Sequence, residues 1–162
     1  MRKRYGLAAA LLMVAPMLLV PSAYAGTDVK ETITLSDPAY SRHNEAPVVF
    51  SHKKHYCDFY NAYPELYESP CGECHHDKDG NAMADLKEGD AVQKCIECHT
   101  KPEYIKGKAA KGLSKKQKRE YHANALHDNC KGCHKRYNKP KKLKPGQPGY
   151  APTTCKTCHI KG

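Results

Sequence analysis

Four short cysteine–histidine motifs constrain this chain more than any other feature. Eight of its nine cysteines form C-x-x-C pairs, and a histidine directly follows each pair. C-x-x-C-H is the attachment signal of c-type haem. Two thiols on one helical turn can bond the two vinyl groups of a porphyrin, while the adjacent histidine reaches the iron as its proximal ligand. The attachment residues are Cys71, Cys74, Cys95, Cys98, Cys130, Cys133, Cys155 and Cys158, and the proximal ligands are His75, His99, His134 and His159.

Two other kinds of site also use paired cysteines. C-x-x-C pairs build zinc ribbons, and in an oxidising compartment they can close as disulfides. Neither alternative requires a histidine after every pair. With 10 histidines in 162 residues, four such coincidences have a probability on the order of 10⁻⁵. The motifs therefore predict four covalently attached haem c groups.

The chain is too polar to fold around an ordinary aliphatic core. Its mean hydropathy is −0.78, and it has two phenylalanines and no tryptophan. Domains of this size normally depend on one hydrophobic core, so an enzyme barrel or a doubly wound sheet is disfavoured. We expect a small multihaem cytochrome that is mostly irregular, with a few short α-helices, a minor N-terminal β-hairpin and a core formed by four haems.

The first 25 residues have the layout of a secretory signal peptide. Basic residues at 2–4 precede an apolar run over residues 7–20, and small residues lie at the −3 and −1 positions of a cleavage site after Ala25. The run is shorter than the ~20 residues that a membrane-spanning helix needs. We expect residues 1–25 to be removed on export. Residues 26–162 would then form one tetrahaem cytochrome c domain in the periplasm, with no transmembrane segment.

The second axial ligand of each iron separates electron carriers from catalysts. Methionine raises the haem potential relative to histidine, and an open position allows ligand chemistry. Three of the four methionines precede residue 26, which leaves Met83 alone for four irons. Six histidines remain besides the proximal ones, so the stoichiometry allows bis-histidine coordination at every haem. These candidates are His43, His52, His55, His76, His122 and His127.

These residues resemble the class III cytochromes c, the tetrahaem cytochrome c3 family. The similarity spans residues 46–160 and is most specific in the F-x-H-x-x-H segment Phe50–His55 and in the doubled histidine after the first motif. The resemblance implies that His52 is the distal ligand of the first haem, His76 that of the second and His55 that of the third. All four motifs are short, as in the second type of these cytochromes, whereas many members widen the second and fourth.

The resemblance leaves two candidates for the distal ligand of the fourth haem. The family often reads Y-H-A-x-x-H-D shortly before the third motif, where this chain has Tyr121–Asp128. At 100° per residue, His122 and His127 lie about 140° apart on a helix and cannot serve one face. His127 precedes an aspartate as the family's ligand does, so it is favoured over His122. His43 has polar neighbours and is expected to be exposed.

Local patterns predict few regular elements. A capping box opens a helix over Ser114–Leu126, and short turns are expected at each C-x-x-C-H motif. Thr32–Leu35 and Pro47–Phe50 predict two short strands. Lys139–Gly149, rich in lysine, proline and glycine, predicts a loop. Cys57 has no pair, and is expected to be either a buried inert thiol or one half of an intermolecular disulfide.

The net charge of +10 hides two oppositely charged halves. Residues 26–100 carry 7 Lys and Arg against 14 Asp and Glu, and residues 101–162 carry 17 against 3, so their net charges are −7 and +14. A lysine-rich surface can be simply solvated. It can also steer an acidic redox protein onto the 101–162 half, and the resemblance implies hydrogenase or a membrane redox complex as that partner. Nucleic acid is not expected for an exported chain, and the opposite charges would favour head-to-tail oligomers.

The sequence therefore predicts a periplasmic electron-transfer protein with no catalytic residues. It would carry electrons between a dehydrogenase such as hydrogenase and membrane or terminal redox partners. One alternative is a haem-containing reductase, or its electron-donating subunit, in which one haem keeps an open coordination position. Another is a wire-like assembly of many copies.

Overall fold

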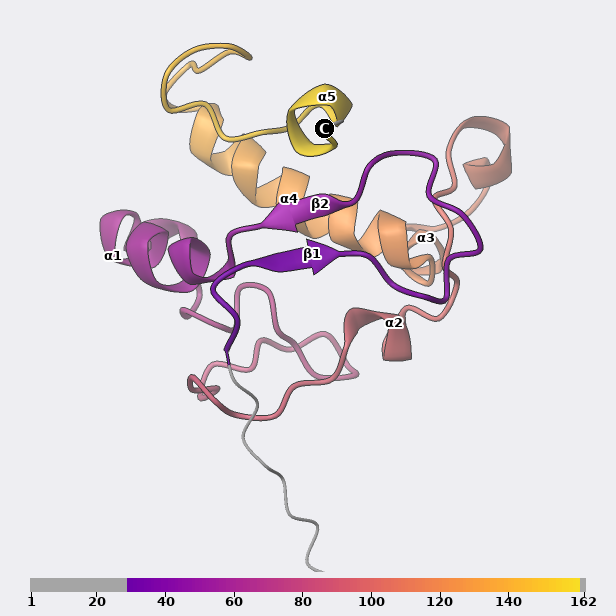
Figure 1. Ribbon diagram of the computed structural model, residues 1–162, viewed down its shortest axis with the longest axis horizontal. Coiled ribbons are helices and arrows are strands. Elements are labelled where there is room, and N and C mark those ends of the chain that lie inside the picture. The colour runs from indigo at the N-terminus through magenta and orange to yellow at the C-terminus, as the bar shows by residue number, and fades with distance from the viewer. Residues whose placement is uncertain (1–28, 161–162) are drawn as a thin grey trace, which may run out of the picture.

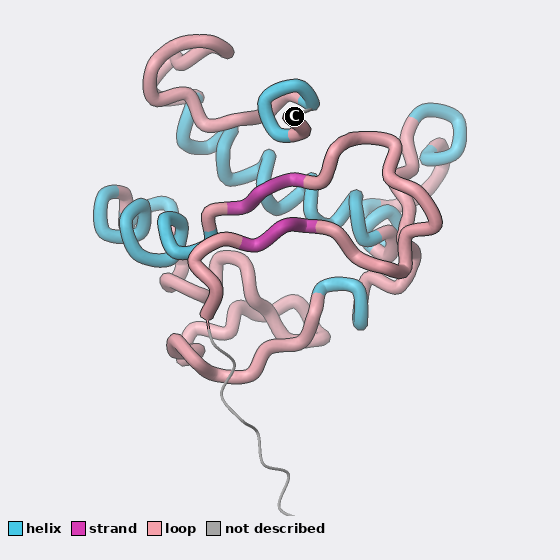
Figure 2. The backbone as a smooth tube through the Cα atoms, in the orientation of Figure 1, coloured by secondary structure: helices cyan, strands magenta, loops and turns pink. Residues whose placement is uncertain are grey.

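The computed structural model describes residues 29–160, so the expected signal peptide over residues 1–25 lies outside the described part. Short elements are joined by long loops and turns, with one longer helix among them (Figures 1 and 2). In chain order they are β1 (Ile33–Leu35), β2 (Val48–Phe50), the π-helical segment η1 (Lys54–Phe59), α1 (Tyr60–Ala62), the 3-10 turn η2 (Pro64–Leu66), α2 (Cys95–Cys98), the 3-10 turn η3 (Gly107–Ala110), α3 (Lys115–Arg119), α4 (His122–Asn138) and α5 (Cys155–Cys158).

The two predicted strands are confirmed as an antiparallel pair. Ile33 faces Phe50 and Leu35 faces Val48 across the ladder. The side chains of these four residues are half-buried, whereas Val49 is exposed, as the two-residue period of a strand requires. In Figure 1 the pair crosses in front of α4, and β2 leads directly into η1.

The predicted helix over Ser114–Leu126 is wrong as a single element. Its capping box is present, because Gln117 N donates to Ser114 Oγ at 3.2 Å and Ser114 N donates to Gln117 Oε1 at 2.9 Å. The helix stops after five residues, and Tyr121 takes an extended conformation before α4 begins. A strand-like bridge forms there instead, in which the amide of His122 donates to the carbonyl of Lys101 at 2.8 Å. This long-range pairing outweighs local helix propensity.

The third haem motif lies inside the longest described helix. Short turns were expected at all four motifs and are found at three: α2, α5 and the turn at Cys71–Cys74. The third motif, Cys130–His134, continues without interruption in the 17-residue α4. The helix ends at Asn138, with Lys139 as its C-cap, and Pro140 has no N–H with which to extend the helical hydrogen bonds. The predicted loop over Lys139–Gly149 is confirmed.

No apolar side chain is buried among residues 29–160. Four residues of that range reach the buried class: Gly72 and the polar residues Ser69, His122 and Asn138. A domain of more than 100 residues ordinarily depends on one hydrophobic core. The protein part described here therefore supplies no aliphatic core of its own, as the polar composition predicted.

Close packing at Gly72 fixes the turn of the first motif. Its amide donates to Ser69 Oγ at 2.8 Å, and a Cβ atom added there would meet that hydroxyl and lie 3.2 Å from the backbone of Met83. We expect Gly72→Ala to lower the free energy of unfolding by about 1–3 kcal/mol, as overpacking typically does. Thermal unfolding of the haem-loaded protein measures this loss.

The double variant Gly72→Ala/Ser69→Ala tests the cause. Since the second substitution removes the hydroxyl that the new methyl group meets, the double variant should lose less stability than the two single losses added together. Simple additivity would show that the two side chains do not compete for the same space.

Candidate haem sites

Each motif histidine faces a second histidine from another part of the chain. The facing residue comes from the segment 52–55, from the doubled histidine after the first motif, or from α4. The ring centres are 6.3 Å apart for His52 and His75, 5.9 Å for His76 and His99, 6.2 Å for His55 and His134, and 6.0 Å for His127 and His159.

These separations fit one metal ion held between two imidazoles. Metal–imidazole bonds are about 2.0–2.1 Å long and the bonding nitrogen lies about 1.1 Å from the ring centre, so two rings on opposite sides of one ion have centres about 6.3 Å apart. Three of these pairs are the ones that the resemblance implies, and the fourth contains His127, the candidate favoured over His122. The four pairs involve every C-x-x-C-H histidine once and no histidine twice.

Backbone carbonyls orient most of these imidazoles. A carbonyl oxygen only accepts, so a hydrogen bond to it places the ring proton on Nδ1 and leaves the Nε2 lone pair free for a metal. The Nδ1–carbonyl distances are 3.3 Å for His52 and Lys30, 2.8 Å for His55 and Ser51, 2.7 Å for His76 and Asp77, 2.5 Å for His99 and Arg119, 2.5 Å for His134 and Pro152, and 2.7 Å for His159 and Ala46.

His127 is held differently. Its Nδ1 atom is buried and has no partner in full hydrogen-bond geometry among the described residues, although the backbone of Ala123 lies close enough to raise its pKa slightly against the larger effect of burial. The ring of Tyr104 packs edge-on against the imidazole instead, with the ring centres 4.6 Å apart. The orientation of His127 therefore depends on aromatic packing and on its place in α4.

Burial favours the neutral form of three of these histidines. Desolvation is the largest cause that lowers the pKa of His55, His75 and His127. Neutral imidazole is the form that ligates a metal. Burial therefore favours the neutral form of these three imidazoles, which is the form that can bind a metal.

The motif cysteines have neither zinc-site nor disulfide geometry. All nine cysteines lie within the described range and none is disulfide-bonded. Residues 29–160 contain no group of three or more His, Cys, Asp or Glu side chains that could hold a metal ion. This donor set fits thioether attachment of haem better than either alternative.

Phe50 explains the spacing of the F-x-H-x-x-H segment. Its ring centre lies 5.9 Å from that of His52 and 4.5 Å from that of His55. It comes from β2, and the chain enters η1 directly after His52 and Lys53. One aromatic ring thus packs against both candidate distal ligands of this segment.

An ion pair joins the first motif to α4. The guanidinium of Arg136 donates to the half-buried carboxylate of Glu73, which lies between the two cysteines of the first motif. The same guanidinium reaches the carbonyl of Leu66 at 3.4 Å. Because Arg136 follows the third motif by two residues, this contact fixes the first and third motifs relative to each other.

The remaining candidate histidines lie away from the four pairs. His122 is buried, and its Nδ1 atom lies 2.9 Å from the hydroxyl of Tyr40. His43 is exposed, as expected, and its ring stacks on Tyr40 with centres 5.4 Å apart. Cys57 is half-buried on η1 and has no cysteine partner.

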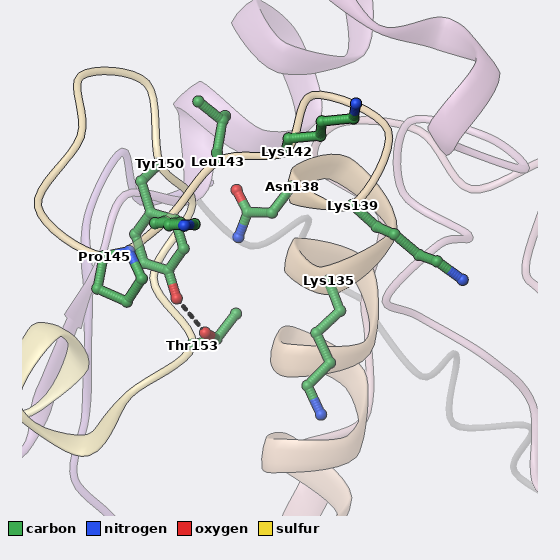
Figure 3. A pocket seen from close by; sticks show the side chains of 9 residues that line it. Lys135, Asn138, Lys139, Lys142, Leu143, Pro145, Tyr150 and Thr153 are labelled. Carbon is green, nitrogen blue, oxygen red and sulfur yellow. Dashed lines mark hydrogen bonds between the residues drawn. The ribbon is translucent and has the colours of Figure 1, made fainter.

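Lysines surround a cavity between the end of α4 and the loop that follows it. The cavity has a volume of about 690 Å³, and Asn138, Tyr150 and Thr153 lie on its wall. Figure 3 shows Lys135 and Lys139 extending from α4, with Tyr150 and Thr153 opposite them. We call the four exposed lysines of this cavity the lysine cluster: Lys135, Lys139, Lys142 and Lys144.

A second cavity adjoins the His127–His159 pair. It has a volume of about 300 Å³ and is lined by Tyr104, His127 and Lys131, among others. Lys135 lines both cavities, so the lysine cluster reaches the neighbourhood of the candidate fourth haem site. No helix within residues 29–160 is both long enough and apolar enough to cross a bilayer.

Comparison with known proteins gives one family. A family model described as the class III cytochrome c family matches residues 29–159. A curated protein named cytochrome c3, from Desulfovibrio desulfuricans, is 28% identical over 136 residues, which cover 83% of this chain and 98% of that protein. No solved structure matches significantly.

Proposed function

The chain belongs to the class III cytochrome c family, and we propose that it is a periplasmic, low-potential electron carrier with four bis-histidine c-type haems. Membership in this family supports a multihaem electron-transfer protein with covalently bound haem c, because cytochromes c3 are electron carriers rather than enzymes. The observation that carries the finer proposal is the set of four histidine pairs with ring centres 5.9–6.3 Å apart.

In this proposal each haem is held by one motif and one distant histidine. When bound, each haem supplies an iron that cycles between the ferrous and ferric states. The eight motif cysteines attach the porphyrins, and His75, His99, His134 and His159 are the proximal ligands. The distal ligands are His52 for the first haem, His76 for the second, His55 for the third and His127 for the fourth.

Bis-histidine ligation accounts for the proposed chemistry. Two histidines fill both axial positions, so neither a substrate nor a small gas can bind the iron without displacing a ligand. Histidine on both sides also keeps the potential below that of a methionine-ligated haem. In a chain with no buried apolar side chain among residues 29–160, the four haems would form the core.

The N-terminal segment supports export of the protein. Residues 1–25 carry the signal-peptide pattern, so we place the tetrahaem domain, residues 26–162, in the periplasm. Nucleic acid is not an expected partner of a protein in that compartment. The opposite charges of the two halves of this domain, −7 and +14, also favour head-to-tail association, which size measurement across ionic strength would reveal.

The lysine cluster is the proposed docking surface for an acidic redox partner such as hydrogenase or a membrane redox complex. Its four ammonium groups are exposed, and the cavity that they surround shares Lys135 with the cavity beside the His127–His159 pair. Positive charge next to a redox centre raises the rate at which an acidic partner reaches electron-transfer distance.

Neutralising this surface should slow docking. We expect the triple variant Lys135→Gln/Lys139→Gln/Lys142→Gln to lower the rate constant for reduction by hydrogenase under hydrogen about tenfold at low ionic strength, and to remove most of its salt dependence. Stopped-flow absorbance of the haems measures both quantities.

The control changes the same number of charges in the acidic half. Lys54, Lys87 and Lys94 are exposed, and replacing these three by glutamine should leave the rate within about twofold because the partner docks elsewhere. Equal losses in both triple variants would point to net charge rather than to a docking surface.

Carbon monoxide tests the proposed function as a whole. The dithionite-reduced wild-type protein should keep four six-coordinate, low-spin haems and bind almost no carbon monoxide within seconds. Rapid binding of one equivalent would replace this proposal with the alternative of a reductase with one open haem.

A further inference from the structure

We infer that Asn138 tunes the third haem site by fixing the carbonyl of Pro152 against Nδ1 of His134. This inference rests on the proposed function, in which His134 is an iron ligand. It concerns the ring nitrogen that faces away from the metal, and it assigns a role to a residue outside the C-x-x-C-H motif.

Asn138 joins the segment around Ala151 to the end of α4 through two hydrogen bonds. Its side-chain Nδ2 donates to the carbonyl of Ala151 at 2.7 Å, and the amide of Ala151 donates to its Oδ1 at 3.0 Å. Because a carbonyl only accepts and an amide N–H only donates, both bonds hold for one orientation of the side chain alone. Asn138 is 6% exposed, so water cannot replace these bonds easily.

Ala151, which Asn138 holds, directly precedes Pro152, the residue that contacts His134. The carbonyl of Pro152 accepts from Nδ1 of His134 at 2.5 Å. Proline has no N–H, so a hydrogen bond from its own amide cannot anchor it. Its position depends on its neighbours: Ala151 on one side, and Thr153 on the other, whose hydroxyl is hydrogen-bonded to that of Tyr150. Figure 3 shows Asn138 on the end of α4 and the Tyr150–Thr153 contact across the cavity.

This arrangement has a chemical consequence for His134. A hydrogen bond from Nδ1–H to a well-placed carbonyl increases electron donation from Nε2 to the metal. Stronger donation stabilises the ferric state and lowers the potential of that haem. Asn138 is therefore a positioning residue that acts on the third haem through Ala151 and Pro152.

A second asparagine on α4 gives a matched comparison. Asn124 pairs with Ile105 in the same way, with Nδ2 donating to its carbonyl at 3.0 Å and Oδ1 accepting from its amide at 2.9 Å. It holds the segment that presents the Tyr104 ring to His127, 4.6 Å away. The same pair of hydrogen bonds on the same helix thus serves a different histidine.

The test compares Asn138→Ala with Asn124→Ala in the haem-loaded protein. Haem methyl resonances followed by NMR through a redox titration report each haem separately. In Asn138→Ala the haem attached at Cys130 and Cys133 should shift to a more positive midpoint potential, because the carbonyl is no longer fixed. Asn124→Ala should leave that haem unchanged while lowering the melting temperature by a similar amount.

The outcomes separate this inference from the proposed function. A wild-type protein without four bis-histidine haems contradicts the proposed function. A wild-type protein with them, together with an unmoved third haem in Asn138→Ala, overturns the inference alone, as does an equal shift of that haem in both variants. If Asn138→Ala does not fold, the milder Asn138→Ser keeps a polar side chain but is too short to make both hydrogen bonds with Ala151. It should shift the same haem in the same direction, and no shift at that haem would overturn the inference.

Discussion

His127→Ala should leave one of the four haems open to carbon monoxide, whereas His122→Ala should leave all four closed. The ring of His127 lies 6.0 Å from that of His159, at the separation that one iron between two imidazoles requires. Alanine removes that ligand and cannot replace it. We therefore expect the reduced variant to bind about one equivalent of carbon monoxide rapidly, and one haem to become high-spin.

His122→Ala is the matched control because the two histidines are the two candidates that the family resemblance leaves for this haem. His122 is buried, and its Nδ1 atom lies 2.9 Å from the hydroxyl of Tyr40. Its loss should cost about 1–3 kcal/mol of stability by leaving that hydroxyl without its partner, with no change in ligation. Carbon monoxide binding by His122→Ala and not by His127→Ala would exchange the two assignments. Absorbance titration of both reduced variants settles the choice.

The histidine pairs could be anticipated because covalent chemistry fixes half of each site. The motif dictates where the cysteines and the proximal histidine lie relative to each other. The distal partners were implied by the resemblance to the class III cytochromes c, through the doubled histidine and the F-x-H-x-x-H segment. The short strands were also predictable, since the alternation around Val49 is a local pattern. Features of this kind depend on spacing of a few residues.

Features that depend on contacts between distant segments were not predictable. The helix expected over Ser114–Leu126 breaks at Tyr121 because His122 pairs with the backbone of Lys101. No local signal marks that bridge. The two asparagines of α4 read in the sequence as weak helix formers, and their hydrogen bonds with Ile105 and Ala151 appear only when three segments are brought together.

We expect this chain to fold only when haem is attached, because the contacts between its distant segments are polar and weak. The ion pair of Arg136 with Glu73 and the hydrogen bond of His134 with Pro152 hold segments together, yet no apolar side chain is buried among residues 29–160. Single hydrogen bonds of this kind contribute roughly 0.5–1.5 kcal/mol each, far less than the conformational entropy that a domain loses on folding. The proposed haems would supply the apolar surface around which these segments close.

The haem-free chain should therefore lose nearly all of its stability, from the roughly 5–15 kcal/mol of an ordinary domain to about zero. Apart from the 17-residue α4, the longest continuous helical stretch among the described residues runs over 52–62, and isolated helices shorter than about 12–15 residues are marginal in water. Replacing the eight motif cysteines by serine prevents attachment, and far-UV circular dichroism should then show little helix and no cooperative thermal transition. The haem-loaded protein, measured in the same buffer, should unfold cooperatively. A cooperative transition in the haem-free chain would mean that the polypeptide holds a core of its own, and the assignment of that role to the haems would have to be abandoned.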